Sequence, residues 1–554
     1  MRFRFCFSLG LALLLLAARP LSAEESPLVQ ALLAPTSAQP KLIRALLEQE
    51  DARLLPILEA WRSGEIFLYT AGDGQRVPFL LSASARADGT REALVIETGK
   101  PLADAQGRTL YFQAGTLTPL DTNAAIRRAI RDVTEVAGLS APSSDTRRAA
   151  AERLGQSQRA EHLPLLQARA EREQSPEVRA ALADAIALVQ VKHGDLQAQL
   201  RALRVLKASH HLGVLTQLKE LVAKAEANPG SVPPALVEAA RSTITATENY
   251  FFWVNFFGTL FRGFSLGSVL LVTALGLAIT YGLMGVINMA HGEVMVVGAY
   301  ATYMTQTVFA RVFGAESSAF HYYFIAALPV AFVSAALVGA VLERGIIQWL
   351  YKRPLESLLA TWGVSLVLQQ AFRTIFGASN VPIATPWYLM GNTTWHDIIF
   401  AYNRVFVIGF AAVVVVGTWL LLTRTRFGLY IRAVTQNRGM AACMGVPTER
   451  VNMMTFAFGS GLAGLAGACL TQLGNVGPGL GQTHIVDSFM VVVSGGVGNL
   501  AGTVFAALGI GAIDQVLQPF LGAVLGKIIV LVAIILFLQW KPGGLFPTRN
   551  RSLD

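Results

Sequence analysis

The chain has few charged residues and very little cysteine. Of its 554 residues only 15% are charged, whereas 53% are hydrophobic and the mean hydropathy is +0.47. Soluble domains contain about 25% charged residues, so this composition excludes a chain that lies wholly in water. The three cysteines, Cys6, Cys443 and Cys469, leave residues 24–250 without any. A disulfide framework is therefore excluded there, and packing alone must hold that region.

The sequence also lacks an ATP-binding motif. The nearest approach is GAVLGK at 522–527, where three residues separate the two glycines and Ile528 follows the lysine. The Walker pattern requires four residues between the glycines and a Ser or Thr after the lysine. The N-terminal half has no Ser/His/Asp spacing and no cluster of metal ligands. We expect no catalytic residue, no metal and no cofactor bound by this chain.

Acidic residues are scarce in the second half. Residues 251–554 contain nine acidic and 16 basic residues, whereas residues 24–250 are nearly neutral. The pI of about 9.6 therefore reflects Lys and Arg beside apolar segments, as in the cytoplasmic loops of membrane proteins. This distribution favours a membrane and lipid as partner, and it does not indicate nucleic acid.

The first 23 residues have the three parts of a secretory signal peptide. Arg2 and Arg4 form a positive n-region, an apolar run follows at 5–18, and LSA at 21–23 ends in the small residue that cleavage requires. A short uncleaved membrane anchor is the alternative. In both cases the residues from 24 to 250 are expected in the periplasm.

Residues 24–245 are expected to form a periplasmic, mainly α-helical domain. Residues 24–62 have a helical pattern, residues 65–120 have short β-like runs separated by glycine turns, and the pattern then becomes helical again. TRRAAAERLG at 146–155 is echoed 31 residues later by EVRAALADAI at 177–186. Helix pairs at this spacing resemble HEAT repeats, which stack on one another. The sequence thus predicts a HEAT-like domain with a β-rich insert.

Residues 250–547 are expected to form an α-helical polytopic membrane domain. A spanning helix needs about 20 mostly apolar residues. Eight simple passes that begin outside would also end outside, on the wrong side for the basic tail at 548–554, so we expect eight or nine spans. The segments concerned are 264–286, 289–309, 320–342, 357–377, 404–422, 452–473, 485–518 (as one or two passes) and 524–540.

Basic loops predict the orientation of these spans. Lys and Arg concentrate in 343–356, in 423–450 and around the C-terminal tail, so these segments are expected in the cytoplasm. The sparsely charged segment 378–403, which contains Trp387 and Trp395, is expected outside. The predicted location is the bacterial inner membrane.

Polar residues interrupt the apolar stretch GVINMAHGEVMVVGAY at 285–300. Asn288, His291 and Glu293 fall within six residues, and ionisable side chains at membrane depth are costly and usually functional. Asn288 and Gly292 continue a helix poorly, so a helix break is expected. Two hypotheses stay open. The break lies near the cytoplasmic face, where His291 and Glu293 reach water or pair locally, or it presents polar groups to a translocation path.

Small residues are dense in the later spans. GSGLAGLAGA at 459–468 and GVGNLAG at 496–502 contain small residues four positions apart. Such spacing lets helices approach closely in lipid. We expect four glycines to pack helices together: Gly464, Gly467, Gly498 and Gly502.

The longest basic loop, TRTRFGLYIRAVTQNRGMAACMGVPTERV at 423–451, has a helical pattern with apolar faces in its middle. An amphipathic cytoplasmic helix can lie on lipid headgroups or fit a groove of a partner protein. The loop alone does not decide between them.

Four stretches resemble the permease subunits of branched-chain amino acid-type ABC transporters. They are ALGLAITYGLMGVINMAHGEVMVVGAY, RTRFGLYIRAVTQNRGMAACMGVPTERVNMMTFAFGSGLAGLAG, VVVSGGVGNLAGTV and WKPGGLF, and they occur in order between about residues 255 and 547. The large exported extension on such a core is similar to the urea-transporter branch of that family.

This resemblance implies a heteromeric importer. Its parts are this permease, a second homologous permease, two cytoplasmic ATP-binding subunits and a periplasmic solute-binding protein. A cytoplasmic loop of such permeases sits in a cleft of the ATPase, which favours the partner-groove interpretation of 423–451. The positions that match the family pattern for that loop are Arg426, Gly428, Arg432, Asn437 and Gly445.

The resemblance implies ATP-driven import of urea, with branched-chain amino acids as the alternative within the family. Three other classes are weighed against it. A passive urea or ammonia channel needs no cytoplasmic ATPase to drive it, and the long basic loop argues against such a channel. An ion-coupled transporter would require more buried carboxylates and an inverted repeat. A membrane-anchored scaffold would place the main function in the exported repeat domain.

Overall fold

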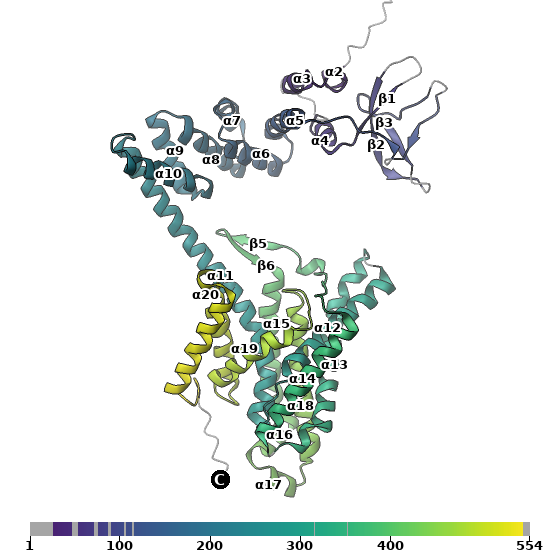
Figure 1. Cartoon of the computed structure of the whole chain (residues 1–554), viewed down its shortest axis with the longest axis vertical. Coiled ribbons are helices and arrows are strands. Elements are labelled where there is room, and N and C mark those ends of the chain that lie inside the picture. Colours follow the sequence, from purple (N-terminus) through teal and green to yellow (C-terminus); the bar gives the residue numbers. More distant parts are fainter. Residues whose placement is uncertain are drawn as a thin grey trace, which may run out of the picture. The chain divides into compact units, whose positions relative to one another are not determined.

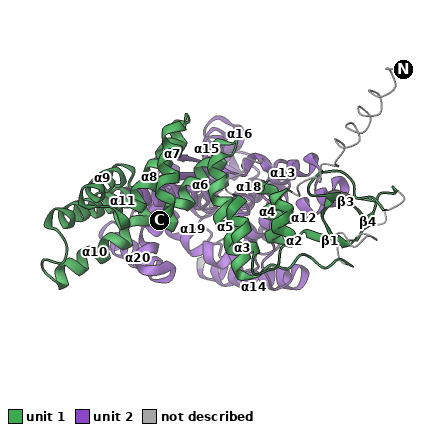
Figure 2. Ribbon diagram, turned by 90° about the horizontal axis from the view of Figure 1, so that it is seen from above, with its two compact units in different colours: residues 1–250 green, residues 251–554 purple. Residues whose placement is uncertain are grey.

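The computed structural model describes residues 26–46, 54–70, 76–86, 90–104, 107–113, 116–314, 316–351 and 353–546. The predicted signal peptide and the predicted cytoplasmic tail lie outside these residues. The chain divides into two compact units, an N-terminal unit (residues 1–250) and a C-terminal unit (residues 251–554), which Figure 2 shows in different colours.

Three short helices and a β-sheet begin the N-terminal unit. The helices are α2 (Pro27–Leu33), α3 (Gln39–Ala45) and α4 (Leu54–Ser63). The sheet is antiparallel in the order β1 (Ile66–Thr70), β2 (Arg76–Ala85), β3 (Arg91–Val95) and β4 (Tyr111–Phe112). These strands fall in the range where the sequence predicts β structure. Trp61 of α4 and Ile66 of β1 are fully buried in one core, so helices and sheet pack as one body.

Helices continue the N-terminal unit to its end. They are α5 (Ala124–Ala137), α6 (Ser144–Ser157), α7 (Leu163–Arg172), α8 (Pro176–His193), α9 (Leu196–Ser209) and α10 (Leu215–Ala227). The 31-residue echo in the sequence has a structural counterpart, because Ala151 and Leu154 of α6 and their equivalents Leu182 and Ala185 of α8 are all buried in one core.

An ion-pair network joins α6 to the end of α7. The side chain of Glu173 is buried and accepts hydrogen bonds from Arg147 of α6 at 2.9 Å and from Arg169 of α7 at 2.8 Å. The Arg147 guanidinium lowers the pKa of the Glu173 carboxyl to about 2. Burial of this carboxylate is tolerated because two guanidinium groups compensate its charge.

Long helices make up most of the C-terminal unit (Figure 1). They are α11 (Pro234–Met284, which begins in the N-terminal unit), α12 (His291–Phe313), α13 (Tyr323–Gly345), α14 (Pro354–Phe376), α15 (Tyr402–Arg424), α16 (Arg426–Gln436), α17 (Arg438–Cys443), α18 (Thr448–Leu470), α19 (Leu480–Gly495) and α20 (Leu500–Trp540). A hairpin of β5 (Asn392–Trp395) and β6 (Ile398–Ala401) precedes α15. Within the described residues, five helical segments are long and apolar enough to cross a membrane. This agrees with a polytopic membrane protein.

The helix α20 is two helical arms joined at a reversal. Gly522 has φ 79° and ψ 164°, a conformation that no helix interior contains and that glycine adopts without strain. Beyond it the chain folds back, because Gly526 lies beside Leu517 and Lys527 forms an ion pair with Asp487 of α19 at 2.9 Å. Residues 485–518, for which the sequence allowed two passes, are divided between α19 and the first arm of α20.

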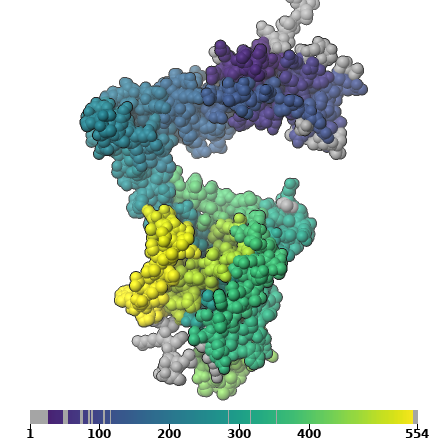
Figure 3. Space-filling model, viewed as in Figure 1, coloured from purple at the N-terminus to yellow at the C-terminus, as the bar shows by residue number. Residues whose placement is uncertain are grey.

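The second arm of α20 is covered with exposed apolar side chains. Val524, Leu536 and Trp540 are among them, and Figure 3 shows α20 in yellow on the surface of the C-terminal unit. Such a surface suits lipid, in which apolar side chains need no protein cover.

The predicted packing glycines lie at close helix crossings. A Cβ atom on Gly464 would overlap the carbonyl of Ala331 in α13, and one on Gly467 would overlap the carbonyl of Met295 in α12. Likewise, a Cβ on Gly502 would overlap the carbonyl of Gly495. Backbone contacts of this kind hold α12, α13 and α18 together where a hydrophobic force between helices is missing.

Glycine is required at position 498 by the backbone conformation. Its φ of 79° lies in the left-handed region, in the short link between α19 and α20. The same link approaches Gly282 of α11 so closely that a Cβ on Gly282 would lie 2.6 Å from the Cα of Gly498. Gly498 therefore serves both the turn and the contact with α11.

Candidate functional site

A helix break precedes α12, in the stretch where the sequence predicts it. Gly285 ends α11 with a φ of 70°, and the chain runs without helix until His291 begins α12. The Asn288 carboxamide oxygen accepts a hydrogen bond from the backbone N–H of Ala290 at 3.0 Å. Asn288 thus stabilises the turn that leads into α12, and its side chain is buried.

His291 points at α11. Its imidazole is completely buried and its Nε2 lies 3.0 Å from the carbonyl oxygen of Thr273. A carbonyl can only accept, so Nε2 carries the proton. The ring occupies the space left by Gly276, where an added Cβ would lie 3.0 Å from the imidazole. This contact fixes the start of α12 against α11.

Glu293 points the other way, between α14 and α19. Its side chain is 1% exposed, and its Oε1 accepts a hydrogen bond from the Ser365 hydroxyl of α14 at 3.4 Å. On the α19 side it packs on Gly481, where a Cβ would lie 2.8 Å from the carboxyl carbon. Its Oε2 is buried without a hydrogen-bond partner among the described residues. This carboxyl therefore has an unused acceptor inside the protein.

Both sequence hypotheses for this break stay open. The side chains of His291 and Glu293 are buried, and their hydrogen-bond partners lie on different helices. A two-residue offset on a helix rotates side chains by about 200°, which explains the opposite directions.

A row of buried polar side chains on α14 faces the same region. Ser357, Thr361, Ser365 and Gln369 are four positions apart and all are buried, so they lie along one face of the helix. Ser365 contacts Glu293, and Thr361 accepts a hydrogen bond from the backbone N–H of Met289 at 3.1 Å. Our predictions from the sequence do not include this row. The four-residue spacing of hydroxyl and amide residues would have revealed it.

The long basic loop forms α16, α17 and a turn that ends at Gly445. We call these residues the coupling segment, after the role that the sequence resemblance predicts for them. Figure 1 places these helices at the end of the C-terminal unit that lies away from β5 and β6. The Thr425 hydroxyl accepts from the N–H of Gly428 at 3.2 Å, and Gly428 has no room for a side chain against Leu422. The Asn437 side chain accepts from the N–H of Met440 at 2.9 Å and so caps α17.

The surface of the coupling segment is partly apolar. Met440 is 62% exposed and Met444 is 80% exposed, and Gly445 ends the segment with a φ of 83°. Arg426 and Arg432 are also exposed. Ile431 is buried in the unit and anchors α16. The segment therefore presents exposed methionines and arginines on a frame fixed by Gly428, Asn437 and Gly445.

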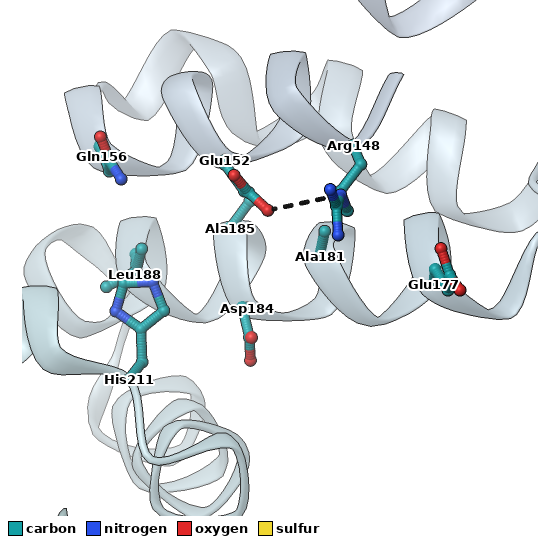
Figure 4. A pocket seen from close by; sticks show the side chains of 9 residues that line it. All are labelled: Arg148, Glu152, Gln156, Glu177, Ala181, Asp184, Ala185, Leu188 and His211. Atoms are coloured by element: carbon teal, nitrogen blue, oxygen red, sulfur yellow. Dashed lines mark ion pairs between the residues drawn. The ribbon is translucent and has the colours of Figure 1, made fainter. Parts of the chain in front are cut away.

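A groove of about 320 Å³ lies in the N-terminal unit between α6 and α8. Figure 4 shows Arg148 and Glu152 on one wall, joined by an ion pair of 4.0 Å, with Asp184 and His211 on the other side. Its floor contains Leu188. Burial raises the pKa of the Asp184 carboxyl above its ordinary value. The part of the chain that the structure describes has no group of three His, Cys, Asp or Glu residues placed to hold a metal ion.

The sequence profile of the family described as "Branched-chain amino acid transport system / permease component" matches residues 259–538. Among similar curated proteins is the high-affinity branched-chain amino acid transport system permease protein BraD of Pseudomonas aeruginosa, 26% identical over 52% of this chain and 94% of that protein. The permease protein LivH of Escherichia coli is 26% identical over 53% of this chain and 96% of that protein. No solved structure matches.

A permease for a different solute is also similar to part of the chain. The ribose import permease protein RbsC of Bacillus subtilis is 32% identical over 21% of this chain and 40% of that protein. The family match begins at residue 259, so the whole N-terminal unit (residues 1–250) lies outside it.

Proposed function

Because the chain belongs to the family of branched-chain amino acid transport permeases, we propose that it forms half of the translocation path of an ATP-driven importer of urea. The permease role in an ABC transporter follows from the family, whose members are not enzymes themselves. Urea as the solute, the composition of the complex and the roles of single residues are the proposal.

The observation that carries the proposal is the buried polar row on α14 opposite Glu293. It offers hydroxyl and amide groups from Thr361, Ser365 and Gln369, and these groups carry no charge. A small neutral solute such as urea needs hydrogen-bond partners on every side and no fixed counter-charge. The carboxylate of a zwitterionic amino acid would instead meet the carboxyl of Glu293, and the cation of this face of α14, Arg373, lies one turn beyond Gln369.

Import of branched-chain amino acids is the second candidate. It is favoured by the names of the relatives, which are permeases for those solutes. Those relatives align with about half of this chain, and the N-terminal extension that supports urea lies outside the aligned part. A passive channel is disfavoured by the coupling segment, since a pore does not need exposed methionines on a capped cytoplasmic helix.

The solute can be tested by uptake of labelled urea and labelled leucine in cells under nitrogen limitation, with and without this gene. We expect deletion to abolish high-affinity urea uptake and to leave leucine uptake unchanged. Loss of leucine uptake alone would establish the second candidate. Undiminished urea uptake would refute the first.

We propose that the coupling segment binds the ATPase from the cytoplasmic side. In this arrangement α11 to α15, α18, α19 and both arms of α20 make nine passes, and an odd number brings the C-terminus to the cytoplasm. The experiment uses Cys443, which is exposed on α17, whereas Cys469 is buried. A membrane-impermeant maleimide should modify Cys443 in inside-out vesicles and fail to modify it in intact spheroplasts. Modification in spheroplasts would reverse the proposed orientation.

We further propose that the exported N-terminal unit docks the solute-binding protein. The support is its predicted location, its stacked helices and the groove of mixed charge between α6 and α8. Deleting residues 24–245 behind the intact signal should reduce uptake and abolish co-purification of the binding protein. Unchanged uptake and association would exclude this role.

A further inference from the structure

Four elements of the C-terminal unit meet at Tyr351, in the loop between α13 and α14. The Tyr351 hydroxyl donates a hydrogen bond to Oε1 of Glu343, in the last turn of α13. The guanidinium carbon of Arg438, the first residue of α17, lies 4.8 Å from the centre of the Tyr351 ring. The same ring packs against a small apolar cluster formed by Val286, Ile347 and Phe456. Tyr351 thus contacts the coupling segment on one side and, on the other, a cluster that includes Val286 of the helix break before α12.

The chemistry of this cluster makes it responsive to a small displacement. Glu343 is a buried carboxyl, and its Oε2 has no hydrogen-bond partner in the described part of the chain. The positive charge of Arg438 sits over the ring that donates to this carboxyl. A cation over an aromatic face is favourable only within about 6 Å of its centre. Movement of α17 by a few ångströms therefore removes the contact between Arg438 and the Tyr351 ring.

The position of Tyr351 in the chain connects such a displacement to the candidate site. Pro354 begins α14 three residues later, and the buried polar row follows on that helix. Val286, a member of the cluster on which Tyr351 packs, precedes Asn288 in the break. Both halves of the candidate site, α14 and the start of α12, are therefore connected to the coupling segment through one side chain.

We propose that Tyr351 is a positioning residue that transmits movement of the coupling segment, received through Arg438, to α14 and to the break before α12. The inference rests on the proposed binding of the ATPase to the coupling segment. It assigns the loop between α13 and α14 an active part in transport. Arg438 and Glu343 are two of the contacts that hold the ring in place.

The test uses the complete transporter reconstituted in proteoliposomes with its ATPase subunits and binding protein. ATP hydrolysis and uptake of labelled urea and labelled leucine are measured together, and the solute that the wild type takes up is used for the variants. Tyr351→Leu removes both contacts, Tyr351→Phe keeps the ring under Arg438, and Arg438→Gln removes the cation. Arg353→Gln is the matched control, because Arg353 ends the same loop and its ion pair with Glu356 at 3.1 Å is solvent-exposed and worth little.

We expect Tyr351→Leu and Arg438→Gln to retain ATP hydrolysis within about twofold of wild type and to lower the solute transported per ATP by about tenfold. The double variant should be no worse than Tyr351→Leu, since both changes interrupt one path. Tyr351→Phe and Arg438→Lys should recover part of the ratio, and Arg353→Gln should match wild type.

A merely structural role gives a different pattern. Hydrolysis and uptake would then fall in proportion with the amount of assembled complex, and that result, or a ratio equal to wild type in every variant, would overturn the proposal. Failure of the proposed function is distinguishable, because the wild-type complex itself would then show no ATP-dependent uptake of either solute.

Discussion

His291 and Glu293 are two positions apart at the start of α12, yet their contacts lie on different helices. The imidazole donates to the carbonyl of Thr273 in α11, whereas the carboxyl accepts from Ser365 in α14. The first contact closes a helix crossing, and the second lies on the buried polar row. Substitutions at the two positions should therefore have separable effects.

Glu293→Gln keeps the size of the side chain and an acceptor for Ser365 while removing the carboxylate. We expect the complex to assemble as wild type and urea uptake to fall by about tenfold, since a buried ionisable group in a membrane is seldom retained without a function. Uptake into proteoliposomes and the yield of complex after size-exclusion chromatography measure the two quantities. Glu356→Gln is the control, because Glu356 lies in the first turn of α14 and its ion pair with Arg353 is exposed. Wild-type uptake by assembled Glu293→Gln would exclude this residue from the path.

His291→Ala should behave in the opposite way. The Thr273 carbonyl loses the hydrogen bond that the imidazole donates. Loss of a buried hydrogen-bond partner costs about 1–3 kcal/mol. We expect a lower yield and a lower unfolding temperature, with normal uptake per assembled complex. Normal stability with lost uptake would instead place His291 in the path.

At the scale of elements, glycines decide how closely the helices approach. Gly467→Ala puts a methyl group into the carbonyl of Met295, and overpacking costs about 1–3 kcal/mol. Gly417→Ala is the matched control, because it lies inside α15 with open space around it. We expect Gly467→Ala to lower the unfolding temperature in detergent and Gly417→Ala to leave it unchanged or raise it. Equal stability of the two variants would refute close packing of α12 on α18.

The stack of α6, α7 and α8 depends on Glu173. The pKa of this carboxyl is about 2 in the folded protein and near 4.5 ordinarily, so its contribution is complete above about pH 4.5 and is lost as the pH falls toward 2. Glu173→Gln should cost about 3 kcal/mol at neutral pH, because it leaves Arg147 buried without its counter-ion. Glu152→Gln changes an exposed ion pair and is the control.

Hydrogen–deuterium exchange of peptides from residues 144–193 of the full chain measures this effect locally. We expect faster exchange in Glu173→Gln at pH 7 and a smaller difference between the variant and wild type near pH 3. A difference that does not depend on pH would contradict the role of the charge.

For the molecule as a whole, the sequence predicts the positions of the helices along the chain better than it predicts the contacts between them. Apolar length alone placed a helix near each expected span, and Gly522 reverses the chain in the gap between the segments 485–518 and 524–540. Helix α11 is longer than the expected span at 264–286. It begins at Pro234, the last residue of the segment ANPGSVPP at 227–234, and the residues that follow contain no further proline to stop it.

The partners of the polar residues could not be predicted in the same way. Glu293 and Ser365 are 72 residues apart, and His291 and Thr273 belong to helices on either side of a break. Local patterns give the face of a helix but not its neighbour, because crossings in lipid are set by close backbone approach at particular glycines. The buried row on α14 was readable from its spacing, and its position opposite Glu293 was not.

The central claim is that this permease moves urea at the expense of ATP hydrolysed by its partners. The most direct measurement is uptake of labelled urea by proteoliposomes that contain the complete transporter and the loaded binding protein, with ATP or a non-hydrolysable analogue on the ATPase side. We predict uptake against a gradient with ATP and none with the analogue. Equal uptake with both nucleotides, or ATP-dependent uptake of leucine with none of urea, would contradict the claim.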